Sequence, residues 1–301
     1  MSDDVVCVID CRRGIENAVE VAGSLIQNFS MTGSLTIIFA TNDRTSVLRS
    51  RVSTLVGSDC SNYIAPGVAA PVLIKEPGSR SILHSALAAS ASVLYRNSTF
   101  VICDAAARAV PMWDSVVRHS CIDQDTIVGS ESSKDQKPAF VVPYGFNANS
   151  LTTGVETIFN NDMHFVPAAI LPSLCIASRA ESMWKLCGDS LTIIGNRELK
   201  LSQMALAMTL AAHRCGLKCF LTTEPIACRA FHSNVSAQWV HESFREVSGG
   251  NDYLERYIGI DVEKQTVFGQ GRLGLTLRPG THECLVKTGM LLSELRASSS
   301  K

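Results

Sequence analysis

The chain has 301 residues, of which 46% are hydrophobic and 18% are charged, and its formal net charge at pH 7 is -1. This composition is typical of a globular protein with one large domain, or with a domain and an appendage. The near-neutral charge argues against nonspecific binding to nucleic acid, because that binding needs a basic face to displace counterions.

The eleven cysteines follow no zinc-binding or disulfide pattern. There is no CxxC motif and most cysteines lie in apolar runs, so we expect buried, reduced thiols in a cytoplasmic protein. The N-terminal MSDDVVCVID is acidic and unlike a signal peptide. The apolar stretches at 166–177 and 204–212 are shorter than the ~20 residues that cross a bilayer, so we expect no membrane span.

Strand-like and helix-like segments alternate in the first half of the chain. In chain order we expect a strand at 5–10, a helix at 15–29, a strand at 34–40, a polar turn entering a helix at 41–55, short segments at 62–67 and 71–80, a helix at 81–94, a strand at 99–104 and a helix at 110–121. Repeated β-α-β units with short connections predict an α/β fold, an open, mostly parallel twisted sheet with helices on both faces.

Ligands bind such sheets beyond the carboxyl ends of the strands. The polar residues at these strand ends are therefore expected on one rim: Asp10, Asn42, Asp43 and Asp104. From residue type alone, Asn42 and Asp43 equally suit an Asx-capped turn.

The second half is less regular. We expect a polar loop at 130–139, a β excursion at 140–162, a core helix or strand at 165–177, a helix at 179–188, a long helix at 198–216 and a strand at 217–223. Gly216 is placed to stop the long helix, because glycine accepts the left-handed conformation at a helix C-terminus. Beyond Trp239 the pattern weakens, up to a last helix near 283–297.

Five segments carry a family resemblance: VVCVID, SLTIIFATND, the block from VLIKEPGSR to FVICDAAARAVP, IASRAESMWKLCG, and AAHRCGLKCFLTTEPIACRAFH. In this order they resemble the GT-A fold of nucleotide-sugar glycosyltransferases, in particular the family 2 group, over residues 4–235. The resemblance implies a nucleotide-sugar binding and catalytic domain at 1–235 and an acceptor-side extension at 236–301.

The resemblance implies transfer of a sugar from a nucleoside diphosphate donor, such as a UDP-sugar, to an acceptor hydroxyl with inversion. The acceptor is a glycan, a protein or a modified nucleic-acid base, and homo-oligomerisation is left open. By position, the donor-binding residues would be Asp10, Arg12, Asn42, Asp43, Lys75, Arg80 and His84. His84 could instead be a polar cap on the core. Lys75, Arg80 and Arg108 could substitute for a metal at the diphosphate, or be solvated surface charges.

Two departures from the family concern its chemistry. Members bind a divalent cation, Mn²⁺ or Mg²⁺, through an aspartate pair after the fourth strand, where this chain has CDAA. Asp104 is present, Ala106 is no ligand, and His232 matches a position where members add a histidine. The resemblance thus implies a cation at Asp104 and His232, although a hard cation needs several oxygen ligands.

The second departure is at the general base. The acidic pair of the family falls at Met204 and Ala205 here, and the nearest acid is Glu198. Glu198 is therefore the candidate base, with Asp104 as the other candidate catalytic residue; an acid in a first helical turn is also favoured by the helix dipole alone. Two alternatives stay open: a catalytically degenerate scaffold that keeps the nucleotide pocket, and an unrelated doubly wound nucleotide-binding module.

Overall fold

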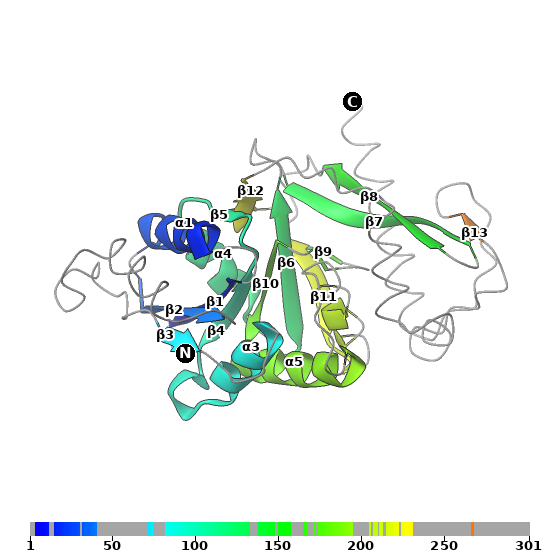
Figure 1. Ribbon diagram of the computed structural model, residues 1–301. Helices are drawn as coiled ribbons and strands as arrows, with labels where there is room; N and C mark the ends of the chain where they lie inside the picture. Colours follow the sequence, from blue (N-terminus) through cyan, green and yellow to red (C-terminus); the bar gives the residue numbers. More distant parts are fainter. Residues whose placement is uncertain are drawn as a thin grey trace.

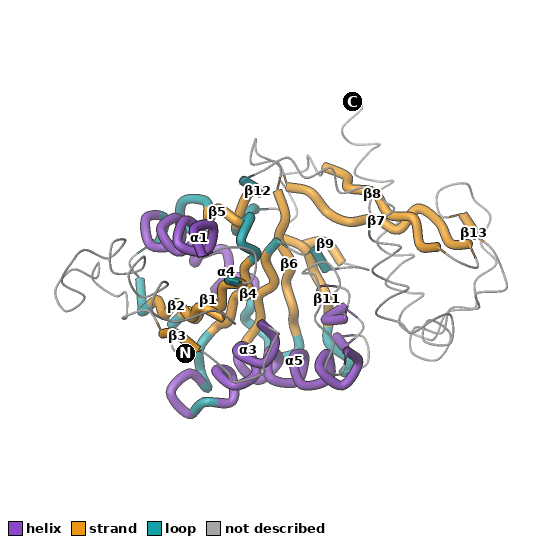
Figure 2. The backbone as a smooth tube through the Cα atoms, in the orientation of Figure 1, coloured by secondary structure: helices purple, strands orange, loops and turns teal. Residues whose placement is uncertain are grey.

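A computed structural model gives the fold (Figure 1). The residues it describes are 4–11, 15–30, 32–40, 72–74, 82–132, 138–147, 150–157, 165–167, 171–172, 174–194, 205, 207–209, 211–212, 215–222, 224–230 and 266–267. All thirteen strands described within these ranges are connected by hydrogen bonds into one sheet (Figure 2).

The described part of the first half has the predicted alternation, whereas the helix expected at 41–55 and the segment expected at 62–67 lie outside the described residues. Its elements are β1 (Val5–Asp10), α1 (Ile15–Gln27), β2 (Leu35–Ala40), β3 (Val72–Ile74), α3 (Ile82–Ala91), the 3-10 helix η1 (Val93–Tyr95), β4 (Thr99–Cys103), β5 (Ala107–Ala109) and α4 (Trp113–Ser120). Every residue of β1, β2 and β4 is buried, as expected for apolar runs in the middle of a parallel sheet.

The second half adds strands to the other side of β4. Its elements are β6 (Thr126–Ser132), β7 (Pro138–Asn147), β8 (Ser150–Thr157), β9 (Phe165–Pro167), β10 (Cys175–Arg179), α5 (Ala180–Ile194), β11 (Lys218–Thr222), β12 (Ala227–Arg229) and β13 (Thr266–Val267). The β excursion, the helix at 179–188 and the strand at 217–223 are thereby confirmed.

The central part of the sheet has the strand order β3-β2-β1-β4-β10-β6-β11-β9. β3, β2, β1 and β4 are parallel to one another, and β6 and β11 are parallel to each other. β10 lies antiparallel between β4 and β6, so β6 and β11 run in the direction of β4. The predicted open, mostly parallel sheet is confirmed, while the reversed direction of β10 was not predicted.

A second, antiparallel part of the sheet extends from the end of β6. β7 pairs with β6, β8 and β13, and β12 pairs with β5 and with the end of β6. Figure 1 shows β7 and β8 reaching away from the helix-covered part. Within the expected extension at 236–301, the structure describes only β13.

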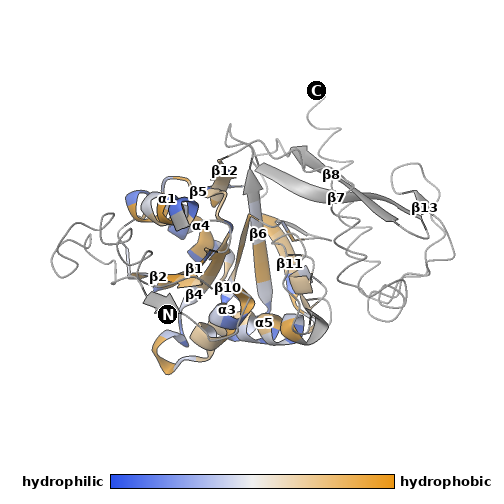
Figure 3. Ribbon diagram, viewed as in Figure 1, coloured by the Kyte–Doolittle hydropathy of each residue, from blue (hydrophilic) through white to orange (hydrophobic). Residues whose placement is uncertain are grey.

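The two faces of the central sheet have different helical covers. One face carries α1 and α4, whose residues Ala18, Leu25 and Trp113 belong to one buried cluster with Cys7 and Ile37. The other face carries α3 and α5, which lie side by side (Figure 1). α3 contacts β1 and β2, and α5 contacts β4 and β10. β1, β4 and β10 are hydrophobic, whereas α1 alternates between hydrophilic and hydrophobic (Figure 3). This is the pattern of helices that bury one stripe against a sheet.

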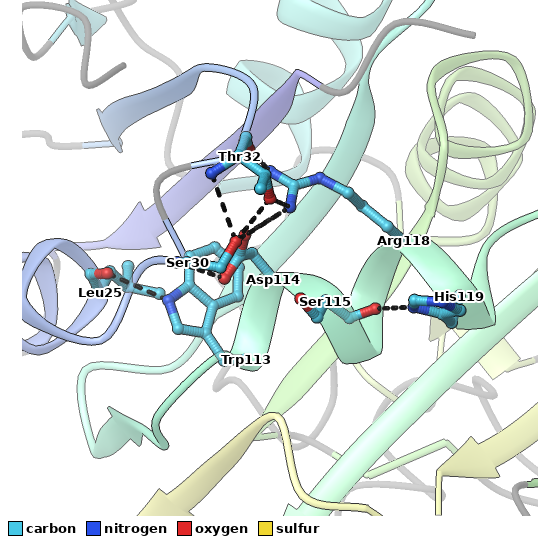
Figure 4. Close-up of polar contacts among 8 residues, drawn as sticks. All are labelled: Leu25, Ser30, Thr32, Trp113, Asp114, Ser115, Arg118 and His119. Carbon is cyan, nitrogen blue, oxygen red and sulfur yellow. Dashed lines mark hydrogen bonds and ion pairs between the residues drawn. The ribbon is translucent and has the colours of Figure 1, made fainter. Parts of the chain in front are cut away.

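A buried polar network fixes α4 to the turn between α1 and β2 (Figure 4). Asp114 is fully buried and accepts hydrogen bonds from the backbone and hydroxyl of Ser30 and from Arg118. Arg118 also donates to Thr32, and the Trp113 indole donates to the Leu25 carbonyl at 3.0 Å. The buried carboxylate is thus both paired and hydrogen-bonded, which a buried charge requires.

The long helix predicted at 198–216 is described at 205, 207–209 and 211–212, all helical. Gly216 has φ of 68°, and the Leu217 N–H donates to the Ala212 carbonyl at 2.9 Å. A left-handed glycine with this hydrogen bond across five residues is a Schellman end, so the predicted stop at Gly216 is confirmed.

Two predictions about the middle of the chain were inaccurate. The segment at 165–177 is no single core element, because β9 ends at Pro167 and β10 begins at Cys175. The loop expected at 130–139 is shorter, because β6 continues to Ser132 and β7 begins at Pro138. Pairing between β6 and β7 extends both strands into the polar segment that was expected to be a loop.

No helix in the described part of the chain is long and apolar enough to cross a membrane.

Candidate functional site

Asp10 and Asp104 lie side by side in register at the carboxyl ends of β1 and β4. Ile9 pairs with Cys103, and the two aspartates each stand one position further along. Neighbouring strands are about 4.8 Å apart. Both aspartates are buried, with 2% and 3% of their surface exposed. The sheet therefore brings together two acids that are 94 positions apart in the sequence.

The pair β1 and β4 is also the point where the strand order reverses. From β1 the chain continues through α1 to β2 on one side, and it returns through α3 to β4 on the other side. α1 and α3 cover opposite faces of the sheet. Ligands of open α/β sheets bind in the crevice at such a switch point, and Asp10 and Asp104 stand at its edge.

Asp104 organises the turn between β4 and β5. Its Oδ1 accepts from the Ala106 N–H at 2.9 Å, and its carbonyl accepts from the Ala107 N–H at 2.9 Å. Its own N–H donates to the Leu174 carbonyl at 2.9 Å. Asp104 therefore has a capping function in addition to any role toward a ligand.

The chain returns to this turn at β12. The Ala230 N–H donates to the Ala106 carbonyl at 2.8 Å, directly after β12 has paired with β5. Ser130 contributes to the same corner, because its buried hydroxyl accepts from the Ile226 N–H at 2.9 Å. Sequence reasoning missed β5, β12 and this serine, since three-residue strands have no detectable periodicity.

His84 lies on the same face of the sheet as Asp10. Successive side chains of a strand point to opposite faces, so Asp10 points away from Ile9 and from the α1 side, toward the face that α3 covers. His84 is the third residue of α3 and is half-buried. Its Nδ1 is buried and has no hydrogen-bond partner among the described residues. A buried nitrogen without a partner is destabilising, so a ligand that supplied one would be favoured there.

Arg108 points to α1. Its guanidinium forms an ion pair with Glu20 and donates to the Ala107 carbonyl at 2.8 Å. These contacts hold the side chain against α1, so we assign Arg108 no role toward a diphosphate.

The described residues alone do not fit a divalent cation. Within the ranges that the structure describes, no group of three His, Cys, Asp or Glu side chains could hold a metal ion. Asp104 uses Oδ1 in its turn, and Ala106 offers no side-chain ligand. The other proposed ligand, His232, lies outside the described residues.

Seven of the predicted site residues lie outside the described residues: Arg12, Asn42, Asp43, Lys75, Arg80, Glu198 and His232. Their placement beside Asp10 and Asp104 stays a prediction from the family resemblance.

A pair of thiols lies directly beneath the Asp104 turn. Cys103 and Cys175 are opposite one another on β4 and β10, and their sulfurs are 3.6 Å apart. The hydrogen bond with Cys103, together with burial, holds the pKa of the Cys175 thiol well above its ordinary value. Burial likewise raises the pKa of Cys121 to about 12. The prediction of buried, reduced thiols is confirmed for seven of the nine described cysteines, all of them free; Cys215 is exposed and Cys228 half-buried.

No protein-family model matches the chain, and no curated protein matches it significantly in sequence. Solved structures to which it is similar include GalNAc-T7 with UDP, GalNAc and Mn²⁺ (8% identity, TM-score 0.49, covering 84% of this chain and 50% of that one), the bifunctional glycosyltransferase WbbM in its apo form (10%, 0.42, 85% and 51%) and UTP-bound UGPase from Acinetobacter baumannii (12%, 0.41, 81% and 93%). The chain spans about half the length of the first two. These are distant likenesses, and the nucleotides and the Mn²⁺ are ligands of those proteins.

Proposed function

We propose that the chain is a glycosyltransferase that binds a nucleoside diphosphate sugar at the carboxyl edge of the sheet. The observation that carries the proposal is the position of Asp10 and Asp104, neighbours in register at the switch point between β1 and β4. The half-buried His84, with its unpartnered Nδ1, supports it from the adjoining helix. In this proposal residues 1–235 form the donor-binding domain, residues 236–301 the acceptor side, and the protein acts in the cytoplasm.

The reaction would be a single displacement with inversion. The acceptor oxygen forms a bond to the anomeric carbon while the bond to the phosphate oxygen breaks, and the nucleoside diphosphate leaves with the electron pair. The proton of the acceptor hydroxyl passes to a general base, for which Glu198 is the candidate. We propose donor contacts from Asp10, Arg12, Asn42, Asp43, Lys75, Arg80 and His84. Fixed cationic side chains would stabilise the negative charge that develops on the leaving diphosphate. Lys75 and Arg80 are the candidates in this chain.

Binding of a divalent cation would require His232 as a ligand in addition to Asp104. If Asp104 and His232 held Mn²⁺ or Mg²⁺ together, the cation would neutralise the departing diphosphate. No step of the reaction above depends on it.

The first test measures ligand binding through the midpoint temperature of thermal unfolding. A ligand that binds only the native state at 100 times its Kd stabilises that state by about 2.7 kcal/mol. We expect UDP, GDP or one of their sugars to raise the midpoint, in titrations with and without Mn²⁺. If none of them does, both the transferase and a scaffold that keeps a nucleotide pocket are excluded.

The second test separates the capping function of Asp104 from a role toward the donor. Asp104→Asn keeps an oxygen that can accept from the Ala106 N–H but removes the charge, whereas Asp104→Ala removes both. We expect slow hydrolysis of the donor by the wild type and its loss in Asp104→Asn, with unfolding close to that of the wild type. Hydrolysis at an undiminished rate in Asp104→Asn would contradict a role for this carboxylate.

A catalytically degenerate scaffold is the second candidate function. The observation that favours it is that Oδ1 of Asp104 is used in the turn beside Ala106, a position that lacks the second carboxylate. It predicts nucleotide binding without turnover, whichever acceptor is offered.

A further inference from the structure

The end of β4 opposite Asp104 borders an open groove of about 1160 Å³. Its lining comes from the end of α3, from η1, from the loop before β6 and from the start of α5. We name it the amino-edge groove, after the amino ends of the parallel strands. The residues of its lining that carry the argument are Val93, Arg96, Ile122, Asp123, Arg179 and Trp184.

Exposed apolar side chains are concentrated around this groove. The described part of the chain has five large hydrophobic residues that are exposed: Val93 (88%), Leu94 (84%), Met112 (59%), Ile122 (57%) and Trp184 (50%). Three of them line the groove, and Leu94 adjoins Val93. Single exposed apolar residues are ordinary, but a cluster of them marks an interaction surface.

Val93 and Leu94 form an ordered protrusion. The Ser92 hydroxyl accepts from the Leu94 N–H at 3.3 Å, and the Tyr95 N–H donates to the Ser92 carbonyl at 3.1 Å. The Ser98 N–H then donates to the Tyr95 carbonyl at 2.9 Å, which joins the protrusion to β4. One surface therefore carries an aliphatic protrusion beside a hollow that Ile122 and Trp184 help to line.

The same surface also carries two opposite charges, on Arg96 and Asp123. Arg96 and Asp123 are exposed, and neither forms an ion pair with a residue of the described ranges. Two other charges of the groove are engaged: Arg179 donates to Thr99 at 2.9 Å, and Glu181 pairs with Lys185 at 3.0 Å.

We propose that the amino-edge groove is a two-fold interface with a second copy of this chain. A two-fold interface presents one patch to itself, so the patch must contain both members of each complementary pair. Here Val93 and Leu94 of one copy would enter the hollow beside Ile122 and Trp184 of the other, and Arg96 would face the other copy's Asp123. A partner whose contact surface carried only positive or only negative charge would place a like charge against either Arg96 or Asp123.

The lining of the groove indicates a small interface. Twelve residues line it, against about 20–30 residues on each side of an interface of standard size. We therefore expect a weak dimer, with a Kd in the micromolar range. Because the groove lies at the end of the strands away from Asp10 and Asp104, dimerisation leaves the proposed donor site open, and the inference does not rest on the proposed function.

Charge reversal provides the test, by sedimentation velocity of the full chain from about 1 to 200 µM, a span chosen to bracket a micromolar Kd. We expect the wild type to pass from monomer to dimer in this range. Arg96→Glu and Asp123→Arg should each weaken the dimer at least tenfold, because each creates two like-charge contacts. An equimolar mixture of the two variants should dimerise again, because the introduced glutamate then faces the introduced arginine, and Asp123 of one copy faces Arg96 of the other.

Met112→Asp is the matched control, since Met112 is exposed but does not line the groove. It should leave the dimer unchanged. All three variants change exposed residues, and circular dichroism checks that each is folded. A wild type that stays monomeric at 200 µM overturns the proposal. So does a dimer that survives both charge reversals, or a mixture that stays monomeric, because another surface, or a partner other than a second copy, would then be responsible.

Discussion

The two ends of strand β4 are built differently, although a single run of five buried residues joins them. At the carboxyl end, Asp104 is 3% exposed, and its N–H, carbonyl and carboxylate are all hydrogen-bonded. At the amino end, the chain arrives from α3 through a turn that leaves Val93 and Leu94 almost fully exposed. The carboxyl end, which buries a polar side chain, is called the closed end below, and the amino end, which exposes apolar side chains, is called the open end.

Both arrangements are energetically unfavourable unless something compensates for them. A buried carboxylate needs hydrogen bonds or a ligand, and the turn supplies the hydrogen bonds. An exposed aliphatic cluster is stabilised when another surface packs against it, and no described residue of the chain covers Val93 and Leu94. The carboxyl end is thus closed by contacts within the chain, whereas we propose that the amino end is covered by a second copy of the chain.

Among the changes near the closed end, the largest effect is expected from filling the space beside Gly129 in β6. A Cβ at Gly129 would stand 2.3 Å from Cδ of Pro172 and 3.2 Å from a methyl group of Leu221. Because a proline ring cannot move aside, we expect Gly129→Ala to destabilise the protein by about 3 kcal/mol, measured by urea unfolding. The control is Gly188→Ala, where the new Cβ meets only Leu87 at 3.8 Å. A small effect at Gly129 would mean that the closed end is loosely packed.

The next effect concerns the capping function of Asp104. Asp104→Ala leaves the Ala106 N–H without its acceptor, and we expect a loss of about 1–2 kcal/mol in the free energy of unfolding. Asp104→Asn keeps an acceptor and should lose clearly less. Equal losses in the two variants would show that the charge, and not the cap, stabilises the turn.

Alkaline pH should weaken the closed end through its thiols. Cys175 has a pKa raised above the ordinary 9.0, so above pH 9 it keeps its proton in the folded protein and loses it in the unfolded chain. The unfolded chain then binds fewer protons, and stability falls as the pH rises, by up to about 1.4 kcal/mol per pH unit for this thiol. Urea unfolding between pH 8 and 10.5 should give a shallower decline in Cys175→Ser. The exposed Cys215 provides the matched control, because Cys215→Ser makes the same thiol-to-hydroxyl change at an exposed position.

The smallest effect is expected at the open end. Leu94→Ala removes a side chain that is 84% exposed, so the stability of the dilute monomer should change by less than about 0.5 kcal/mol. Phe100→Ala, six residues further on and fully buried, should cost about 3–5 kcal/mol. A large loss from Leu94→Ala in dilute solution would mean that the protrusion packs within its own chain.

Much of the fold could be predicted because local signals and burial agree. β1, β2 and β4 are continuous apolar runs, α1 and α4 have helical spacing, and Gly216 has the left-handed conformation of a helix end. The strand ends follow from the same runs, so Asp10 and Asp104 could be expected on one rim. β5, β9 and β12 could not be recognised, because three residues carry no period and form strands only through their partners.

The sequence by itself determined which residues are apolar, where the main strands end, and hence which polar residues stand at those ends. Only the tertiary structure decided that β10 runs antiparallel beside β4, which places Cys175 against Cys103. It also decided that Asp104 caps its own turn, that Arg108 pairs with Glu20, and that three exposed apolar residues from three separate segments line one groove. The physical reason is that hydropathy and helix ends are local properties, whereas strand pairing and side-chain partners depend on contacts between residues far apart in the chain.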